Sequence, residues 1–116
     1  MEHTMKKFMV LYMAPVSAME QMGKANPEQM KSGMDDWSNW GKKNKKAIVD
    51  MGTPLGKTKR ITPAGVSDAK NDLGGYSIVQ GESLASVSKM FTNHPHFKMV
   101  KGASIEVVEC MPMAGI

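Results

Sequence analysis

The stretch Gly75-Tyr-Ser-Ile-Val-Gln-Gly-Glu-Ser-Leu-Ala-Ser-Val-Ser-Lys-Met-Phe-Thr-Asn-His-Pro-His-Phe97 decides the fold, because it holds a strand, a helix and two histidines in direct succession. Its first part, residues 76–80, has the β-branched pair Ile78 and Val79 at its centre and lies between glycines. Such a segment is typical of a short strand. The sequence therefore predicts a strand that leads directly into a helix.

The predicted helix begins at Ser83, whose hydroxyl can accept a hydrogen bond from a free N–H group of the first turn. Its apolar residues recur at the spacing i, i+3, i+7 and form one stripe that can face a sheet. These residues are Leu84, Val87 and Phe91. We expect the helix to run to about Asn93.

His94 and His96 follow the helix on either side of Pro95. The proline ring disfavours helical geometry at the residue before it, so the helix ends there and presents both imidazoles on the exit loop. Either histidine can titrate near neutral pH and act as a general acid or base. The alternative is a structural clip, in which the imidazoles bond backbone carbonyl groups. A metal site is not expected, because zinc needs three or four ligands and the sequence has no further Cys/His spacing.

An almost continuously apolar segment, residues 7–13, predicts a central strand that is covered on both faces. The chain is long enough for one core but not for a second. The sequence therefore predicts a single domain over residues 6–113, preceded by a frayed leader of residues 1–5 and followed by a tail of residues 114–116.

A long helix is predicted after this strand. Asn26 is a good N-cap, Pro27 suits the first helical position, and Gly52 suits the end of the helix. Lysines late in the segment complement the negative end of the helix dipole. The predicted apolar side consists of Met30, Met34, Trp37, Trp40 or Gly41, Ile48 and Met51.

The remaining elements complete the order of the fold. Residues 57–62 predict a second strand near a sheet edge, residues 63–65 its turn, residues 66–75 a loop, and residues 104–111 the last strand. The order strand, helix, strand, strand, helix, strand is the split βαβ, or ferredoxin-like, arrangement. This is an α+β fold with a four-stranded antiparallel sheet and both helices on one face.

Both faces of the first strand are apolar. Phe8, Val10 and Tyr12 point to one face, and Met9, Leu11 and Met13 point to the other. The helices cover only one of these faces, and a monomer does not leave an apolar face of this size exposed. An identical sheet from a second subunit is the economical cover, so we predict a homodimer with facing sheets.

The composition is that of a soluble globular protein, with 116 residues, 22% charged residues and a net charge of +4. Much of the positive charge lies in Lys42, Lys43, Lys45 and Lys46, a run that can bind phosphates or form a solvated helix face. No basic strand interleaved with aromatic residues accompanies this run, so nucleic-acid binding is not expected. The glycines match no phosphate-binding fingerprint, so no nucleotide or other cofactor is expected.

The single cysteine, Cys110, excludes an intrachain disulfide, and we expect it to be buried and inert. Lys6 and Lys7 before an apolar run imitate a secretory signal, but Tyr12 and Pro15 interrupt that run. No apolar run approaches the ~18 residues that a membrane span needs. We therefore expect a cytoplasmic protein that binds no membrane.

The chain resembles the YCII-like proteins (the YCII-related or Asp-Gly-Pro-Phe-type domain) of the dimeric α+β barrel superfamily. The resemblance covers most of the chain and rests on the order and spacing of short blocks. The blocks are Lys7-Phe-Met-Val-Leu-Tyr-Met-Ala14, Trp37 with Trp40, Asp50-Met-Gly-Thr-Pro-Leu-Gly56, Gly75-Tyr-Ser-Ile-Val-Gln80, Glu82-Ser83, Asn93-His-Pro-His96, Ser104-Ile-Glu-Val107 and Met111-Pro-Met113.

This resemblance implies a ferredoxin-like protomer and a barrel-like dimer. Some members are regarded as enzymes because a histidine and an acid meet in a cleft, and related dimeric barrels include lactone isomerases, monooxygenases and dechlorinating enzymes. This chain lacks the Asp-Gly-Pro-Phe motif and has no histidine early in the first helix. The histidine–aspartate pair of the family is therefore not carried over to this chain.

Further candidate site residues come from the strands and the first helix. Glu106 lies between apolar neighbours on the last strand, where a buried carboxylate would be a working acid, although an edge position in solvent explains it equally well. The candidates for substrate binding are Tyr12, Trp37, Trp40, Lys57 and Tyr76. The aromatic residues can wall an apolar pocket or simply pack in the core, and Lys57 can hold an anion or lie on the surface.

Two functions fit these residues. The first is a cofactor-independent enzyme that uses His94 or His96 for proton transfer on a small anionic or carbonyl-bearing molecule. The second is a non-catalytic ligand-binding or accessory homodimer in which both histidines only secure the helix end.

Overall fold

The computed structural model describes residues 5–15 and 26–112. Residues 1–4 of the predicted leader and the whole predicted tail lie outside the described residues. No helix of the described ranges is both long enough and apolar enough to cross a membrane.

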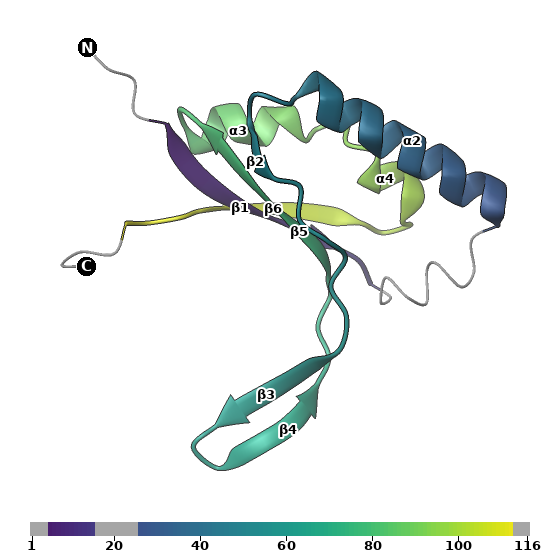
Figure 1. Cartoon of the computed structure of the whole chain (residues 1–116). Coiled ribbons are helices and arrows are strands. Elements are labelled where there is room, and N and C mark those ends of the chain that lie inside the picture. Colours follow the sequence, from purple (N-terminus) through teal and green to yellow (C-terminus); the bar gives the residue numbers. More distant parts are fainter. Residues whose placement is uncertain (1–4, 16–25, 113–116) are drawn as a thin grey trace.

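One four-stranded antiparallel sheet forms the body, in the order β2-β5-β1-β6. Its strands are β1 (Lys6–Met13), β2 (Ile48–Asp50), β5 (Leu73–Gly81) and β6 (Ser104–Glu109). The helices α2 (Pro27–Lys43), α3 (Leu84–Met90) and α4 (His96–Met99) lie on one side of this sheet (Figure 1). The predicted mixed α+β architecture, with a central first strand and helices over one face, is confirmed.

The core lies between the sheet and the helices. In β1, Phe8, Val10 and Tyr12 point into it and are at most 3% exposed. They pack with Val79 of β5, Val87 of α3 and Phe91, which follows α3. The alternation predicted for the first strand is therefore confirmed.

The opposite side of the sheet, which we call the open face, carries Met9, Leu11, Met13, Tyr76, Ile78, Glu106 and Val108. Met9 pairs across the sheet with Ile78 and with Val108. Met9 is 38% exposed and Val108 is 47% exposed. An apolar face is thus present on the side that the helices leave uncovered.

Helix α2 begins as predicted and ends earlier than predicted. The Asn26 side chain accepts a hydrogen bond from the Gln29 N–H group, and the Gln29 side chain accepts one from the Asn26 N–H group. The predicted end at Gly52 is wrong, because the Asn44 backbone and side chain both donate to the carbonyl oxygen of Trp40 and close the helix. The β-branched Ile48 then belongs to β2, which pairs with β5.

The buried side of α2 also differs from the prediction. Trp37 and Trp40 pack against the core, whereas Met34 is 63% exposed. Gly33 is buried instead, and a Cβ atom at this position would lie 2.8 Å from Cε of Met99. The absence of a side chain at Gly33 therefore lets α4 approach α2.

A separate two-stranded hairpin, which we call the arm, consists of β3 (Thr58–Thr62) and β4 (Gly65–Ala69). The prediction that residues 57–62 supply the second strand of the main sheet is wrong, because β2 takes that edge position. The prediction of a loop over residues 66–75 is also wrong, since this range contains most of β4 and the start of β5. Figure 1 shows the arm projecting from the sheet on the side away from the helices.

The segment after β5 matches its prediction only in part, because α3 ends at Met90 and not near Asn93, and His96 begins α4 instead of lying on an exit loop. The Ser83 side chain accepts a hydrogen bond from the Ser86 N–H group and caps α3, as expected. Of the predicted stripe, Val87 and Phe91 are buried, but Leu84 is 48% exposed. The expectation that Cys110 is buried is wrong, because this cysteine is exposed.

Candidate functional site

His94 and His96 lie against aromatic side chains that come from three parts of the fold. The cluster is held by β1, by α2 and by the segment that runs from the end of α3 into α4, in which His94 lies in the connection and His96 is the first residue of α4. We call this group the histidine cluster, and it consists of His94, His96, Tyr12, Trp37, Trp40 and Phe91. The structure thus brings together both predicted histidines and most of the predicted aromatic residues.

His94 lies at the centre of the cluster and is 1% exposed. Its ring centroid is 4.5 Å from that of Trp37 and 4.5 Å from that of Trp40, both in edge-to-face geometry. Tyr12 lies at 5.1 Å and Phe91 at 5.6 Å. Aromatic rings therefore enclose this imidazole on several sides.

The hydrogen bonds of His94 define its tautomer. Nδ1 lies 3.0 Å from the backbone nitrogen of His96 and accepts a hydrogen bond from that N–H group. In a neutral imidazole the other nitrogen must then carry the proton, so Nε2 is a donor. Nε2 is buried, and no partner for it exists in residues 5–15 and 26–112. The cluster therefore encloses an unsatisfied N–H group.

Burial lowers the pKa of His94 to about 3, and the charge of the neighbouring His96 adds to this shift. The cause is desolvation, because an imidazolium among aromatic rings loses its hydration. His94 is consequently neutral at physiological pH and can donate through Nε2 but does not accept a proton.

His96 is fixed to the sheet. Its Nε2 atom lies 2.9 Å from the carbonyl oxygen of Met13 and donates to it, because a carbonyl oxygen can only accept. Burial lowers the pKa of His96, and hydrogen bonding to the backbone of Met13 and Ser104 opposes this shift. This bond ties α4 to the end of β1, as the structural-clip alternative expects.

Two hydrogen bonds in series hold the Tyr12 hydroxyl in place. The Ser77 hydroxyl donates to the carbonyl oxygen of Met51, 2.7 Å away. Because the Ser77 proton is used in that bond, the Tyr12 hydroxyl must be the donor to Ser77 Oγ, 2.9 Å away. Burial raises the pKa of the Tyr12 phenol. No local pattern indicates this role for Ser77, because only the strand register places it beside Tyr12.

The other predicted site residues lie away from the cluster. Glu106 and Tyr76 both pair with Leu11 in the sheet and point to the open face, opposite the histidines. Glu106 is exposed and Tyr76 is half-buried. Lys57 is exposed at the start of the arm. The structure therefore does not place the predicted acid, Glu106, with either histidine.

An apolar groove of about 290 Å³ borders the cluster. It lies between α3, α4 and β6, and its lining includes Leu84, Phe97, Ile105 and Val107. Phe91 lines this groove and also stacks against the His94 ring at an interplanar angle of 27°. The Phe91 ring is thus shared between the groove and the cluster.

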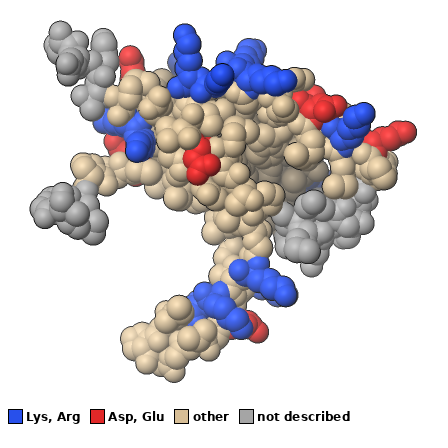
Figure 2. Space-filling view, viewed as in Figure 1, with Lys and Arg blue, Asp and Glu red and all other residues tan. Residues whose placement is uncertain are grey.

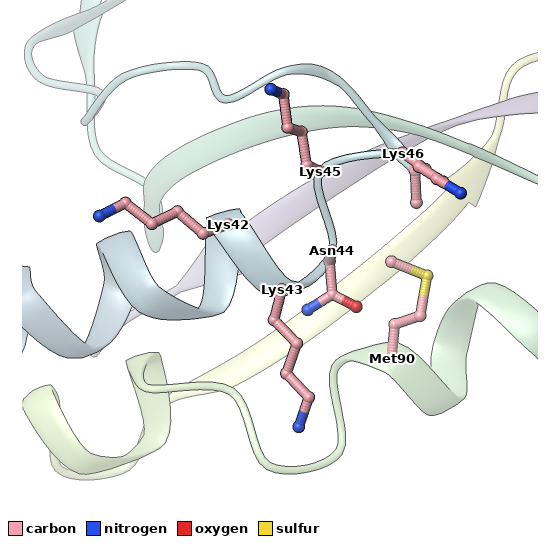
Figure 3. Close-up of a pocket in the computed structure, with 7 residues that line it drawn as sticks. Lys42, Lys43, Asn44, Lys45, Lys46 and Met90 are labelled. Carbon is pink, nitrogen blue, oxygen red and sulfur yellow. The ribbon is translucent and has the colours of Figure 1, made fainter.

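A second depression, of about 450 Å³, follows the end of α2. It is lined by Lys42, Lys43, Asn44, Lys45, Lys46, Ala47 and Met90. Figure 3 shows that the four lysine side chains point away from one another. They do not converge on a common point as a phosphate site requires, and this favours the solvated-surface interpretation of the lysine run.

No group of three or more His, Cys, Asp or Glu residues that could hold a metal ion occurs in the part of the chain that the structure describes.

No family model matches the chain, and no curated protein matches it. Among solved structures, the chain is similar to 5-chloro-2-hydroxyhydroquinone dehydrochlorinase from Burkholderia phenoliruptrix AC1100, in a complex with 2,5-dihydroxybenzoquinone. The sequence identity is 16% and the TM-score is 0.47. The similarity covers 89% of this chain and 91% of that chain. At this level it assigns no function to the protein.

Proposed function

We propose that this chain is a YCII-like, cytoplasmic homodimer that binds a small carbonyl-bearing molecule beside His94. The observation that carries the proposal is the buried Nε2–H group of His94, which has no partner within the described ranges. Buried polar atoms in folded proteins almost always have a hydrogen-bond partner, so an unsatisfied one calls for an explanation. A ligand oxygen is the partner that this donor lacks.

The charge state of His94 defines its part in binding. With a pKa of about 3, the imidazole is neutral, so its role is hydrogen-bond donation and not the general-base role considered from the sequence. A neutral imidazole can polarise a carbonyl group. If the protein is an enzyme, His94 therefore acts as the electrophilic group of a cofactor-independent reaction.

The groove supplies a place for the apolar part of the ligand. Ile105 and Val107 form part of its lining, and Phe91 separates it from His94. Rotation of the Phe91 side chain would open the groove towards the His94 ring. A small flat molecule would then contact apolar side chains and reach a single donor, which is the usual composition of a small-molecule site.

The open face supports the homodimer. Met9, Ile78 and Val108 lie side by side on it, and the helices cover only the other face (Figure 1). A second copy that packs sheet against sheet removes these side chains from water.

4-Hydroxybenzaldehyde is a suitable probe of the proposed site. It is expected to bind the unmodified protein and to shift the NMR signal of the His94 Nε2–H group. His94→Asn keeps an acceptor for the His96 N–H group but places no donor at Nε2. This variant is expected to bind the aldehyde up to about tenfold more weakly in calorimetric titrations, because one hydrogen bond contributes about 0.5–1.5 kcal/mol.

The matched control is His94→Gln, whose longer side chain can place an amide donor near the position of Nε2. It is expected to recover part of the affinity that His94→Asn loses. Equal affinity of His94→Asn and the unmodified protein, or an unchanged His94 signal on addition of the aldehyde, would contradict the proposal.

The second candidate function is a non-catalytic accessory homodimer. It is favoured by the backbone hydrogen bonds of both histidines, from the His96 N–H group to Nδ1 of His94 and from His96 to Met13. In this case the substitutions at His94 change the free energy of unfolding, but the affinity for the aldehyde is the same in the variants and in the unmodified chain.

A further inference from the structure

The arm leaves the body of the domain beside the start of β5. Leu55 donates to the carbonyl oxygen of Gly74 there, and Pro54 forms an isolated bridge with Gly75. Beyond this point β3 and β4 pair only with each other in the sheets of the described chain. The radius of gyration is 16.1 Å, whereas a compact chain of about a hundred residues has about 13 Å. The arm is therefore an extension and not part of the packed body.

The outer part of the arm carries an apolar pair. Ile61 and Val66 lie directly opposite each other in the strand register. Ile61 is 78% exposed and Val66 is 67% exposed. A two-stranded hairpin alone is only marginally stable in water, and an exposed apolar pair contributes little to it. An arm of this kind gains stability when a partner covers the pair.

The position of the arm indicates which partner can do so. It projects on the side of the sheet away from the helices, the side on which the open face lies (Figure 1). A second copy packed on the open face, as in the homodimer proposed above, lies next to the arm. Two-fold symmetry then brings both arms to the neighbouring body at once.

Charge favours the same partner. The arm and its ends carry Lys57, Lys59, Arg60 and Lys70, with Asp68 paired to Lys59. Figure 2 shows basic side chains, in blue, on the arm. Glu106 is exposed on the open face and forms no ion pair with residues 5–15 or 26–112. A basic arm beside a face that presents a carboxylate is electrostatically complementary.

We infer that the arm docks on the body of a second copy of this chain, with Ile61 and Val66 as its apolar contact. The inference rests on the proposed homodimer and adds a second contact to it. The arm is then an intersubunit clasp that continues the interface formed by the two open faces.

Sedimentation equilibrium of the full chain tests the docking. The double variant Ile61→Ser with Val66→Ser is expected to raise the dimer Kd at least about tenfold, since two apolar side chains lose their cover. The matched control is Thr62→Ala with Ser67→Ala, which changes the other face of the arm. This control is expected to keep the Kd of the unmodified chain within about twofold.

The outcomes separate the docking from the dimer. A dimer with the same Kd in the Ile61/Val66 variant and the unmodified chain overturns the docking alone, as does an equal weakening in both double variants. A monomeric unmodified chain overturns the homodimer and the docking together. An isotope-filtered NOE experiment on a mixture of labelled and unlabelled chains is expected to show contacts from the Ile61 methyl groups to the other copy, and their absence in a dimer overturns the docking.

Discussion

The free energy of unfolding is expected to fall by up to about 5 kcal/mol between pH 6.5 and pH 3, because the pKa of His94 is lowered to about 3 in the folded protein. In the unfolded chain this histidine takes up a proton near its ordinary pKa of 6.5. Between the two values the unfolded state binds more protons. Stability is therefore fully present above pH 6.5 and is lost as the pH falls towards 3.

The cause of this loss is local to the histidine cluster. Burial makes the larger contribution to the lowered pKa, and the charge of His96 makes the smaller one. Trp37 and Trp40 approach the His94 ring most closely and carry no charge that could stabilise an imidazolium. Protonation of His94 is thus expected to open the cluster.

Urea unfolding at several pH values between 7 and 4 measures this loss. The matched variant is His94→Asn, which keeps the acceptor for the His96 N–H group but cannot titrate in this range. Carboxylates contribute to acid denaturation in both proteins, so the difference between the two curves isolates His94. Parallel curves for the two proteins would show that His94 does not titrate as a buried group.

The elements that the sequence predicted well are those with local causes. Asn26 and Ser83 cap their helices through side-chain hydrogen bonds to residues three positions later, and this spacing is visible in the sequence. The central strand was found because its residues are apolar on both faces. His94 is a candidate from the sequence because Pro95 disfavours helical geometry at the residue before it, so a helix is predicted to end at this histidine.

The elements that the sequence did not predict depend on pairing between distant residues. Ile48 fits the period of the preceding helix as well as it fits a strand, and only its pairing with Val79 decides in favour of β2. Once β2 takes the edge of the sheet, residues 58–62 have no place there and pair with residues 65–69 instead. A propensity argument cannot distinguish an edge strand from one side of a free hairpin.

The site residues also divide into those that a local pattern indicates and those whose role depends on distant parts of the chain. Trp37 and Trp40 were candidates because their spacing places them on one helix face. The face to which Glu106 points depends on its register with Leu11, and the role of Ser77 depends on the approach of Met51 and Tyr12. Neither relation is encoded in the sequence around those residues.

Gly52→Ala is expected to lower the free energy of unfolding by about 3 kcal/mol or more. Gly52 has a φ angle of +73°, which side chains rarely adopt. A Cβ atom there would lie 1.7 Å from the backbone oxygen of Tyr76 in β5. Neither backbone can yield without disturbing the pairing of β2 with β5, so the substitution strains the edge of the sheet.

The strain is expected to reach the histidine cluster through one hydrogen bond. The residue before Gly52 is Met51, whose carbonyl oxygen accepts the hydrogen bond from Ser77, and Ser77 in turn accepts from Tyr12. A displaced Met51 carbonyl releases Ser77 and with it the Tyr12 hydroxyl, which packs beside His94. Urea unfolding at pH 7 measures the stability, and the NMR signals of the Tyr12 and His94 rings report the change in the cluster.

Gly56→Ala is the matched control for this substitution. A Cβ atom at Gly56 meets nothing within 4 Å. We therefore expect the free energy of unfolding of this variant to differ from that of the unmodified protein by less than about 1 kcal/mol. The expected change is an increase, because alanine restricts the conformations of the unfolded chain. Equal effects of Gly52→Ala and Gly56→Ala would show that the turn after β2 tolerates a side chain. A loss of stability in Gly52→Ala with unchanged Tyr12 and His94 signals would instead show that the Tyr12–Ser77–Met51 chain does not hold the cluster in place.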